Sequence, residues 1–274
     1  MTSLERVVRP AAWAEPPGLV RFGLDSWTVA QAELRKLAHD PSELLTRAVQ
    51  PVLWLIVFGQ VLARARAIPT GSMGYIDFLS PGVLAQSALF SAIFFGIAVI
   101  WERDLGVLHK YLVSPASRVA LVSGKALAGG LRALVQAVVV YLVAAIIGVH
   151  LDLGPLELFG VALVVVLGAA VFATFSLVIA CLVRTRERFM GIGQVLTMPL
   201  FFASSAVYPI AIMPDWLQVL ARINPLTYQV DALRALMVAG GTPTFPIPLD
   251  LGVLAFALVV MIAIAARLYP RLAM

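Results

Sequence analysis

Long apolar stretches separated by short polar ones dominate the sequence. Six stretches contain no Asp, Glu, Lys, Arg or His: residues 48–63, 78–101, 133–149, 158–183, 189–214 and 251–266. A helix needs roughly 20 residues to cross about 30 Å of hydrocarbon. The second, fourth and fifth stretches reach that length alone, and the other three need a few flanking residues. The pattern predicts an all-α integral membrane protein with six transmembrane helices.

The composition supports a membrane location and indicates an orientation. Apolar residues make up 61% of the chain and charged residues 13%, about half the charged share of a soluble domain. With the N-terminus inside, 16 Lys and Arg residues fall on the cytoplasmic side and four fall outside. The positive-inside rule then predicts cytoplasmic N- and C-termini in the plasma membrane. The net charge of +5 therefore reflects topology, and we expect no nucleic-acid partner.

Residues 1–43 are expected to form a cytoplasmic N-terminal segment, followed by a six-helix transmembrane domain at 44–274. Within the first segment, residues 24–40 have helical periodicity, with Ser26 as a possible N-cap and Pro41 as a stop. The apolar face would hold Trp27, Ala30, Leu34, Leu37 and Ala38, and the polar face Gln31, Glu33, Arg35 and Lys36. This pattern predicts an amphipathic helix lying along the cytoplasmic membrane surface.

The stretch 101–118, WERDLGVLHKYLVSPASR, is the longest polar interruption in the middle of the chain. Glu102 and Asp104 fall in what would be the first turn of a short helix, where carboxylates complement the helix dipole. Leu105, Leu108 and Leu112 share one face of that helix. Ser114-Pro115 suggests the start of the next helix. These residues alone allow either an ordinary cytosolic loop or a docking helix.

A second unusual segment, 208–241, contains two helix starts and one stop. Pro214-Asp215 and Asn224-Pro225 are the starts, and Gly240-Gly241 is the stop. Two helices of this length are too short to span a bilayer. Trp216 and Tyr228 suit the membrane interface, so we expect both helices to dip into or lie on the outer leaflet.

Polar residues inside the expected spans have two interpretations. Small and polar side chains at depth usually hold helices together, and a minority contact substrate. Pro199 should kink the fifth span. The arginines of the VRTRER turn at 183–188 are interpreted as topology anchors.

Several kinds of chemistry are missing from the sequence. Gly124-Lys125 lacks the upstream glycine of a phosphate-binding loop, the three histidines have no metal-ligand spacing, and no serine lies in a G-x-S-x-G turn. The expected spans lack the Asp, Glu or His of an ion-coupled carrier, with Arg132 the one borderline charge. We therefore expect no enzyme activity, no metal and no bound cofactor. Uphill transport would need energy from a partner.

Two groups of motifs carry a family resemblance. The first is E-R-D-L-G-V-L (102–108), S-P-A-S-R (114–118) and G-K (124–125); the second is Y-P-I…M-P-D-W-L…I-N-P-L-T-Y…D-A-L-R across 208–234. With both groups of motifs present in this order, the chain resembles the ABC-2 type permeases. These are the membrane subunits of ATP-binding-cassette exporters such as the daunorubicin-resistance type. The resemblance extends from about Leu34 to Leu268. His109 departs from it, because many relatives carry Glu there.

The resemblance implies a role for each segment. Residues 102–113 would form a coupling helix in a groove of a P-loop ATPase that binds ATP and Mg²⁺, and helix 24–40 would be a second contact. Two permeases and two ATPase copies would assemble, with a re-entrant hairpin near the outer exit. The implied coupling residues are Glu102, Arg103, Asp104, Leu105, Gly106, Leu108, Leu112 and Pro115. The implied hairpin residues are Pro214, Trp216, Asn224, Pro225 and Tyr228. The expected substrate path holds Gln86, Ser87, Phe90, Gln194, Thr197 and Ser204.

The functional expectation is export of a hydrophobic or amphiphilic compound, such as a drug, an antibiotic or a lipid-like molecule. Two alternatives within the same family are a polysaccharide or lipid-linked exporter and a sodium exporter. A third alternative, from another class, is a membrane assembly subunit that does not transport, as in cytochrome biogenesis.

Overall fold

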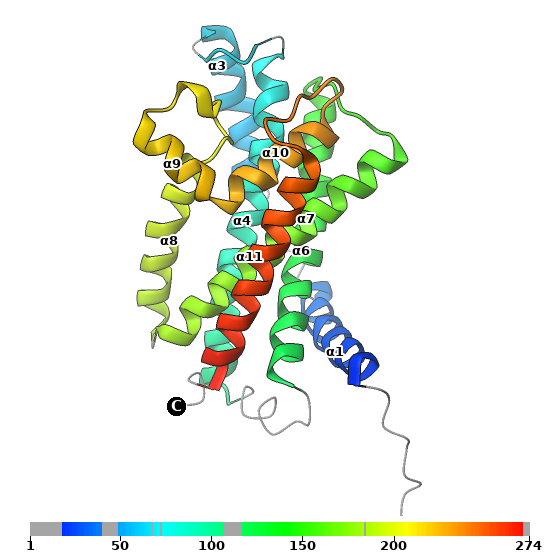
Figure 1. Cartoon of the computed structure of the whole chain (residues 1–274), viewed down its shortest axis with the longest axis vertical. Coiled ribbons are helices and arrows are strands. Elements are labelled where there is room, and N and C mark those ends of the chain that lie inside the picture. Colours follow the sequence, from blue (N-terminus) through cyan, green and yellow to red (C-terminus); the bar gives the residue numbers. More distant parts are fainter. Residues whose placement is uncertain are drawn as a thin grey trace, which may run out of the picture.

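The computed structural model describes residues 18–39, 49–66, 68–71, 73–106, 117–183 and 185–270, and this part of the chain is helical (Figure 1). An isolated β-bridge between Leu151 and Val238 is its only β-type pairing. The helices are α1 (Gly18–His39), a helix at Val49–Ala65 that includes the π-helix η1 (Trp54–Gly59) and α3 (Gln60–Ala65), α4 (Tyr75–Asp104), α6 (Arg118–Ile146), α7 (Pro155–Leu182), α8 (Arg186–Phe202), the short 3₁₀-helix η2 (Ile210–Ile212), α9 (Asp215–Ile223), α10 (Pro225–Met237) and α11 (Ile247–Leu268). The all-α prediction is thus confirmed.

Four of these helices, α4, α6, α7 and α11, are long and apolar enough to cross a membrane. They contain 30, 29, 28 and 22 residues, so each exceeds the roughly 20 residues that a crossing requires. Val49–Ala65 is shorter, and α8 has 17 residues. The prediction of six spans is therefore confirmed for four of them among the described residues.

The length of a charge-free stretch was misleading for one helix. The fifth stretch, 189–214, was expected to cross alone, but α8 ends at Phe202 and turns follow. The third and sixth stretches, 133–149 and 251–266, were expected to need flanking residues, and α6 and α11 do extend beyond them to full length. In α6 the helix continues through charged residues because they have partners inside the protein.

The centre of the bundle is α7, which packs against α4, α6, α10 and α11. Glycines allow close approach between helices here, as is common in membrane bundles. A Cβ atom at Gly130 would lie 2.7 Å from the backbone oxygen of Val166, and one at Gly82 would lie 2.2 Å from that of Ala206. Gly130 therefore lets α6 pack closely against α7, and Gly82 lets α4 pack closely against the turn that follows α8.

The N-terminal helix α1 packs against α6 at one end of the bundle (Figure 1), which we call the α1 end. It begins six residues before the expected start, so Ser26 lies inside the helix and is not its N-cap. The expected faces were right at Ala30, which is fully buried, and wrong at Glu33, which was placed on the polar face but is only 1% exposed. Trp27, on the expected apolar face, is 47% exposed. The buried face runs through Ser26, Val29, Ala30 and Glu33.

At the opposite end of the bundle lie α9 and α10 (Figure 1). Their predicted starts are confirmed, since α9 begins directly after Pro214 and α10 begins at Pro225. The Oδ1 atom of Asn224 accepts a hydrogen bond from the Leu226 amide at 3.0 Å. Its Nδ2 atom donates to the carbonyls of Leu200 and Ala203 at 2.6 and 2.8 Å. One side chain therefore caps the start of α10 and the end of α8 together.

The other two hairpin residues lie at its surface. Trp216 is 66% exposed, and the Tyr228 hydroxyl donates to the carbonyl of Arg222 at 2.6 Å. The depth of this hairpin in the membrane stays a prediction.

The end of α4 differs from the expectation for the 101–118 stretch. Glu102, Arg103 and Asp104 form the last turn of α4 and not the first turn of a separate helix. The chain leaves α4 through Gly106, whose φ of 70° suits a glycine at this position. The next described helix begins at Arg118 with Ser117 as its N-cap, and the expected start at Ser114-Pro115 lies outside the described residues. Leu108, Leu112 and Pro115 lie outside the described residues.

Candidate functional site

Four charged side chains meet inside the α1 end, and we call them the buried ion cluster: Glu33, Glu102, Lys125 and Arg132. The Lys125 ammonium lies 3.0 Å from Glu33 Oε1 and 2.7 Å from Glu102 Oε2. Arg132 approaches the other oxygen of Glu33 at 3.5 Å and donates to its backbone carbonyl at 3.2 Å. Two carboxylates thus face two cations across three helices.

The cluster is shielded from water, which makes its charge balance important. The side chains of Lys125 and Glu33 are each 2% exposed, and those of Glu102 and Arg132 are 10% and 12% exposed. Both cations also lie near the Phe95 ring, at 5.8 and 5.3 Å from its centroid. A buried charge is tolerated when it is paired and hydrogen-bonded. Each member of the cluster therefore depends on the others.

The G-K motif at 124–125 has two separate structural roles. A Cβ atom at Gly124 would lie 2.5 Å from the Ser26 carbonyl oxygen and 2.7 Å from Cβ of Val29. Only glycine lets the backbone of α1 approach α6 this closely. Lys125 then extends from the same point to Glu33 and Glu102. The motif fixes α1 and the end of α4 to α6 at a single location.

A second set of contacts joins the last turn of α4 to the start of α8. Arg186 donates from Nε and Nη2 to Asp104 Oδ2, at 3.1 and 2.7 Å. Its guanidinium also stacks on the Trp101 ring, 3.6 Å from the centroid. Arg103 donates to Asp104 Oδ1 at 3.1 Å and to the carbonyl of Val183 at 3.3 Å. The side chains of Asp104 and Arg186 are about one-third exposed.

These contacts change the interpretation of the E-R-D residues. Glu102 is 7% exposed, so its carboxylate acts inside the chain and is not presented on the surface. Asp104 is directed to α8 by Arg186. Leu105 is 71% exposed at the end of the helix. The last turn of α4 is therefore held on two sides, by Lys125 and by Arg186.

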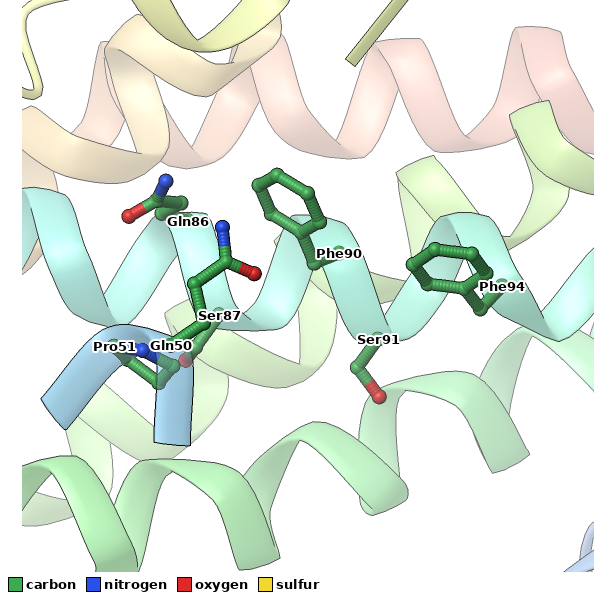
Figure 2. A pocket seen from close by; sticks show the side chains of 7 residues that line it. All are labelled: Gln50, Pro51, Gln86, Ser87, Phe90, Ser91 and Phe94. Carbon is green, nitrogen blue, oxygen red and sulfur yellow. The ribbon is translucent and has the colours of Figure 1, made fainter. Parts of the chain in front are cut away.

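Two adjoining cavities lie between Val49–Ala65, α4 and α8. The smaller, of about 50 Å³, is lined by Gln50, Pro51, Gln86, Ser87, Phe90, Ser91 and Phe94. Figure 2 shows five of these residues in succession along α4, with Gln50 and Pro51 reaching it from the neighbouring helix. The larger, of about 290 Å³, is lined by Gln50, Phe90, Ile93, Phe94, Phe189, Met190, Gly193, Gln194, Thr197 and Met198. Gln50, Phe90 and Phe94 belong to both.

The lining of these cavities is apolar and aromatic, with amides and hydroxyls as its polar groups. None of the described residues that line them carries a formal charge. Five of the six residues expected on a substrate path line one or both cavities. The sixth, Ser204, is fully buried, donates to the carbonyl of Phe201 and lines neither.

Several functional candidates could not be recognised from the sequence. Glu33 was placed on the polar face of its helix, and Arg186 was interpreted as a topology anchor. A partial signal did exist, because Ser26, Ala30 and Glu33 follow a helical i, i+4, i+7 spacing. Lys125 and Arg132 are also seven residues apart, which places both on one face of α6.

The fold and these contacts define a helical membrane protein that has a charge-free cavity and a cluster of paired ions at one end of its bundle. A family model described as ABC-2 type transporter matches residues 25–238, and the chain belongs to that family. It is a membrane transport permease subunit. Permeases of this family work with a separate ABC ATPase and are not ATPases themselves.

Three relatives illustrate the similarity. The chain is 30% identical over 205 residues to a putative transport permease, ycf38, of Cyanophora paradoxa, covering 73% of this chain and 70% of that one. It is 27% identical over 235 residues to the daunorubicin resistance ABC transporter permease protein DrrB1 of Streptomyces coeruleorubidus, covering 85% and 80%. It is 25% identical over 208 residues to the probable doxorubicin resistance ABC transporter permease protein DrrC of Mycobacterium tuberculosis, covering 76% and 74%.

Proposed function

We propose that this permease exports a hydrophobic or amphiphilic compound from the cell, driven by ATP hydrolysis on a partner ATPase that binds the Mg²⁺-nucleotide. The observation that carries this proposal is the cavity between α4 and α8. Phenylalanines and methionines line it, and Gln50, Gln194 and Thr197 supply hydrogen-bonding groups without charge. Ligand sites for small molecules commonly combine an apolar wall with a few polar groups in this way.

The same cavity disfavours the sodium alternative in the family. Ion pathways within membranes commonly carry Asp or Glu side chains, and neither residue is among the described ones that line this cavity. The residues described here offer neutral amides and hydroxyls in their place. At about 290 Å³ the cavity lies near the lower limit of roughly 300 Å³ for drug-sized ligands. A second permease facing the same surface would enlarge it.

We further propose two permeases and two ATPase copies, with the α1 end in the cytoplasm. α8 would offer a second permease an apolar outer face at Met190, Val195 and Phe202. The last turn of α4 lies at the α1 end, so an ATPase on that side would contact the segment that follows it in the sequence. Movement of that segment would reach α4 directly and the cavity through it.

Reconstitution of the permease with its ATPase in lipid vesicles tests this function. Daunorubicin serves as the amphiphilic probe, because a similar permease is named for resistance to it. We expect daunorubicin to stimulate ATP hydrolysis, and NaCl or a lipid-linked polysaccharide to leave it unchanged. Stimulation by sodium or by the polysaccharide alone would overturn the proposed substrate class. Failure to bind any ATPase would support a non-transporting assembly subunit.

A pair of variants connects the stimulation to the cavity. Gln194→Ala removes a cavity amide, whereas Val195→Ala changes the neighbouring residue, which is 70% exposed and lines neither cavity. We expect Gln194→Ala to alter the concentration of daunorubicin that gives half-maximal stimulation. Val195→Ala should behave as the wild type. Equal responses in both variants would exclude this cavity as the binding site.

A further inference from the structure

The wall of the cavity formed by α8 has few neighbours in the bundle. Figure 1 shows α8 on the outside of the helices, below α9, and it packs mainly against α4. Residues Arg186, Phe189, Gly193 and Thr197 recur at spacings of three, four and four, so they share one face of the helix. Phe189, Gly193 and Thr197 on this face line the cavity. The position of α8 therefore determines the shape of the cavity.

Arg186 occupies the end of that face closest to the segment that an ATPase would move. Thr185 caps the helix, and Arg186 is its first residue. Both Nε and Nη2 of Arg186 contact one oxygen of Asp104, while Arg103 contacts the other oxygen. The flat guanidinium rests on Trp101. A planar fork that both stacks and hydrogen-bonds is a geometry that lysine cannot reproduce.

The two carboxylates of the E-R-D motif differ in their surroundings. Glu102 is joined to Lys125 in a buried, balanced cluster, so this contact should persist as the protein moves. The Asp104–Arg186 pair is about one-third exposed, and water can replace either partner when the pair separates. A pair of this kind can open and close during a transport cycle. Only the second contact leads to the cavity-lining face of α8.

We infer that Arg186 is a positioning residue that transmits movement of the last turn of α4 to α8 through Asp104. When the last turn of α4 shifts, the ion pair carries α8 with it and changes the cavity wall at Phe189 and Gly193. The inference rests on the proposed ATP-driven transport function. It assigns to the VRTRER turn a mechanical role distinct from its contribution to membrane topology.

Thiol labelling of the cavity tests this inference. The native cysteine is replaced by Cys181→Ala, and Gln194→Cys places a reporter on α8. Labelling rates are compared in the reconstituted complex without nucleotide and with a trapped ATP state. In the wild-type background we expect the two rates to differ severalfold, because movement of α8 changes access to position 194. Absence of any difference there would overturn ATP-driven movement itself.

Arg186→Gln and Asp104→Asn should each remove most of the difference in labelling rate between the nucleotide-free and the trapped ATP state. Arg186→Lys should also lose most of it, because the fork and the stacking are gone. The exchange Asp104→Arg with Arg186→Asp should restore part of it. Arg188→Gln is the matched control. Arg188 is an exposed arginine two residues further along α8, and its variant should retain the full difference in labelling rate. Melting temperatures close to the wild type's in each variant verify folding.

The results separate the inference from the proposed function. If the wild type responds to nucleotide and Arg186→Gln responds equally, the inference is wrong and the proposed function stands. A loss in Arg188→Gln equal to that in Arg186→Gln would also contradict it, because the effect would then reflect net charge at the turn.

Discussion

The ammonium of Lys125 lies 2.7 Å from Glu102 and 3.0 Å from Glu33, so one side chain joins three helices at the α1 end. Glu102 belongs to the motif that resembles a coupling helix, and Glu33 belongs to the amphipathic N-terminal helix. The two segments expected to contact an ATPase separately are therefore connected to each other inside the permease. A force on either one is applied to the same point of α6.

Lys125→Met should destabilise the protein strongly, because it leaves two carboxylates at a buried site without their shared cation. Removing one partner of a buried ion pair costs about 3–5 kcal/mol. For a chain of this size that corresponds to a decrease in melting temperature of roughly 10 °C. Thermal unfolding of the purified permease in detergent measures the change.

Two further variants show whether unpaired charge causes the loss of stability in Lys125→Met. Lys125→Arg keeps the cation and should lose much less stability. The combination of Lys125→Met with Glu102→Gln leaves one carboxylate, Glu33, with one cation, Arg132, and it should be more stable than Lys125→Met alone. If the double variant melts below the single variant, the loss arises from packing and not from an unpaired carboxylate.

Gly124→Ala should detach α1 from α6, since the added Cβ would meet the Ser26 carbonyl oxygen at 2.5 Å. Backbone atoms cannot move aside as a flexible side chain can, so we expect a loss of about 1–3 kcal/mol. Protease accessibility of residues 18–39 should increase with it. Gly252→Ala is the control, because a Cβ there meets nothing within 4 Å. Equal protease resistance in the two variants would show that the close contact is unimportant.

Asn224→Ala removes the shared cap of α8 and α10. It loses the cap to Leu226, worth about 1 kcal/mol, and two hydrogen bonds to Leu200 and Ala203, worth about 1 kcal/mol each. We expect a total loss of about 2–3 kcal/mol in thermal or denaturant unfolding. Asn224→Asp keeps the acceptor for Leu226 but places carboxylate oxygens against two carbonyls. If Asn224→Asp were as stable as the wild type, the bonds to α8 would contribute nothing.

The sequence predicted the helical class and the hairpin starts correctly, and five of the six residues expected on a substrate path line a cavity. These features depend on local signals: apolar length, proline and asparagine at helix starts, and polar residues within apolar helices. The ends of the membrane helices were less predictable. Counting residues between charges treats every charge as a boundary, but α6 continues past Lys125 and Arg132 because α1 and α4 supply their partners.

The same limitation explains the error at Glu33. Helical periodicity separates polar from apolar positions, yet it does not show which charged residue faces a partner on another helix. Glu33 and Lys125 are 92 positions apart, so their pairing depends on the tertiary arrangement of α1 and α6. The Asp104–Arg186 pair, 82 positions apart, was hidden for the same reason.

The orientation of the bundle can be measured with two cysteines at opposite ends. Leu153, in the segment between α6 and α7, is 65% exposed, and Leu105, at the end of α4, is 71% exposed. We expect a membrane-impermeant thiol reagent to label Leu153→Cys in intact cells and Leu105→Cys only after lysis, because 16 of the 20 Lys and Arg residues then lie on the inner side. The background is Cys181→Ala. The reverse pattern would place the α1 end outside, where no cytoplasmic ATPase could reach the buried ion cluster or the Asp104–Arg186 pair, and the proposed coupling would be wrong.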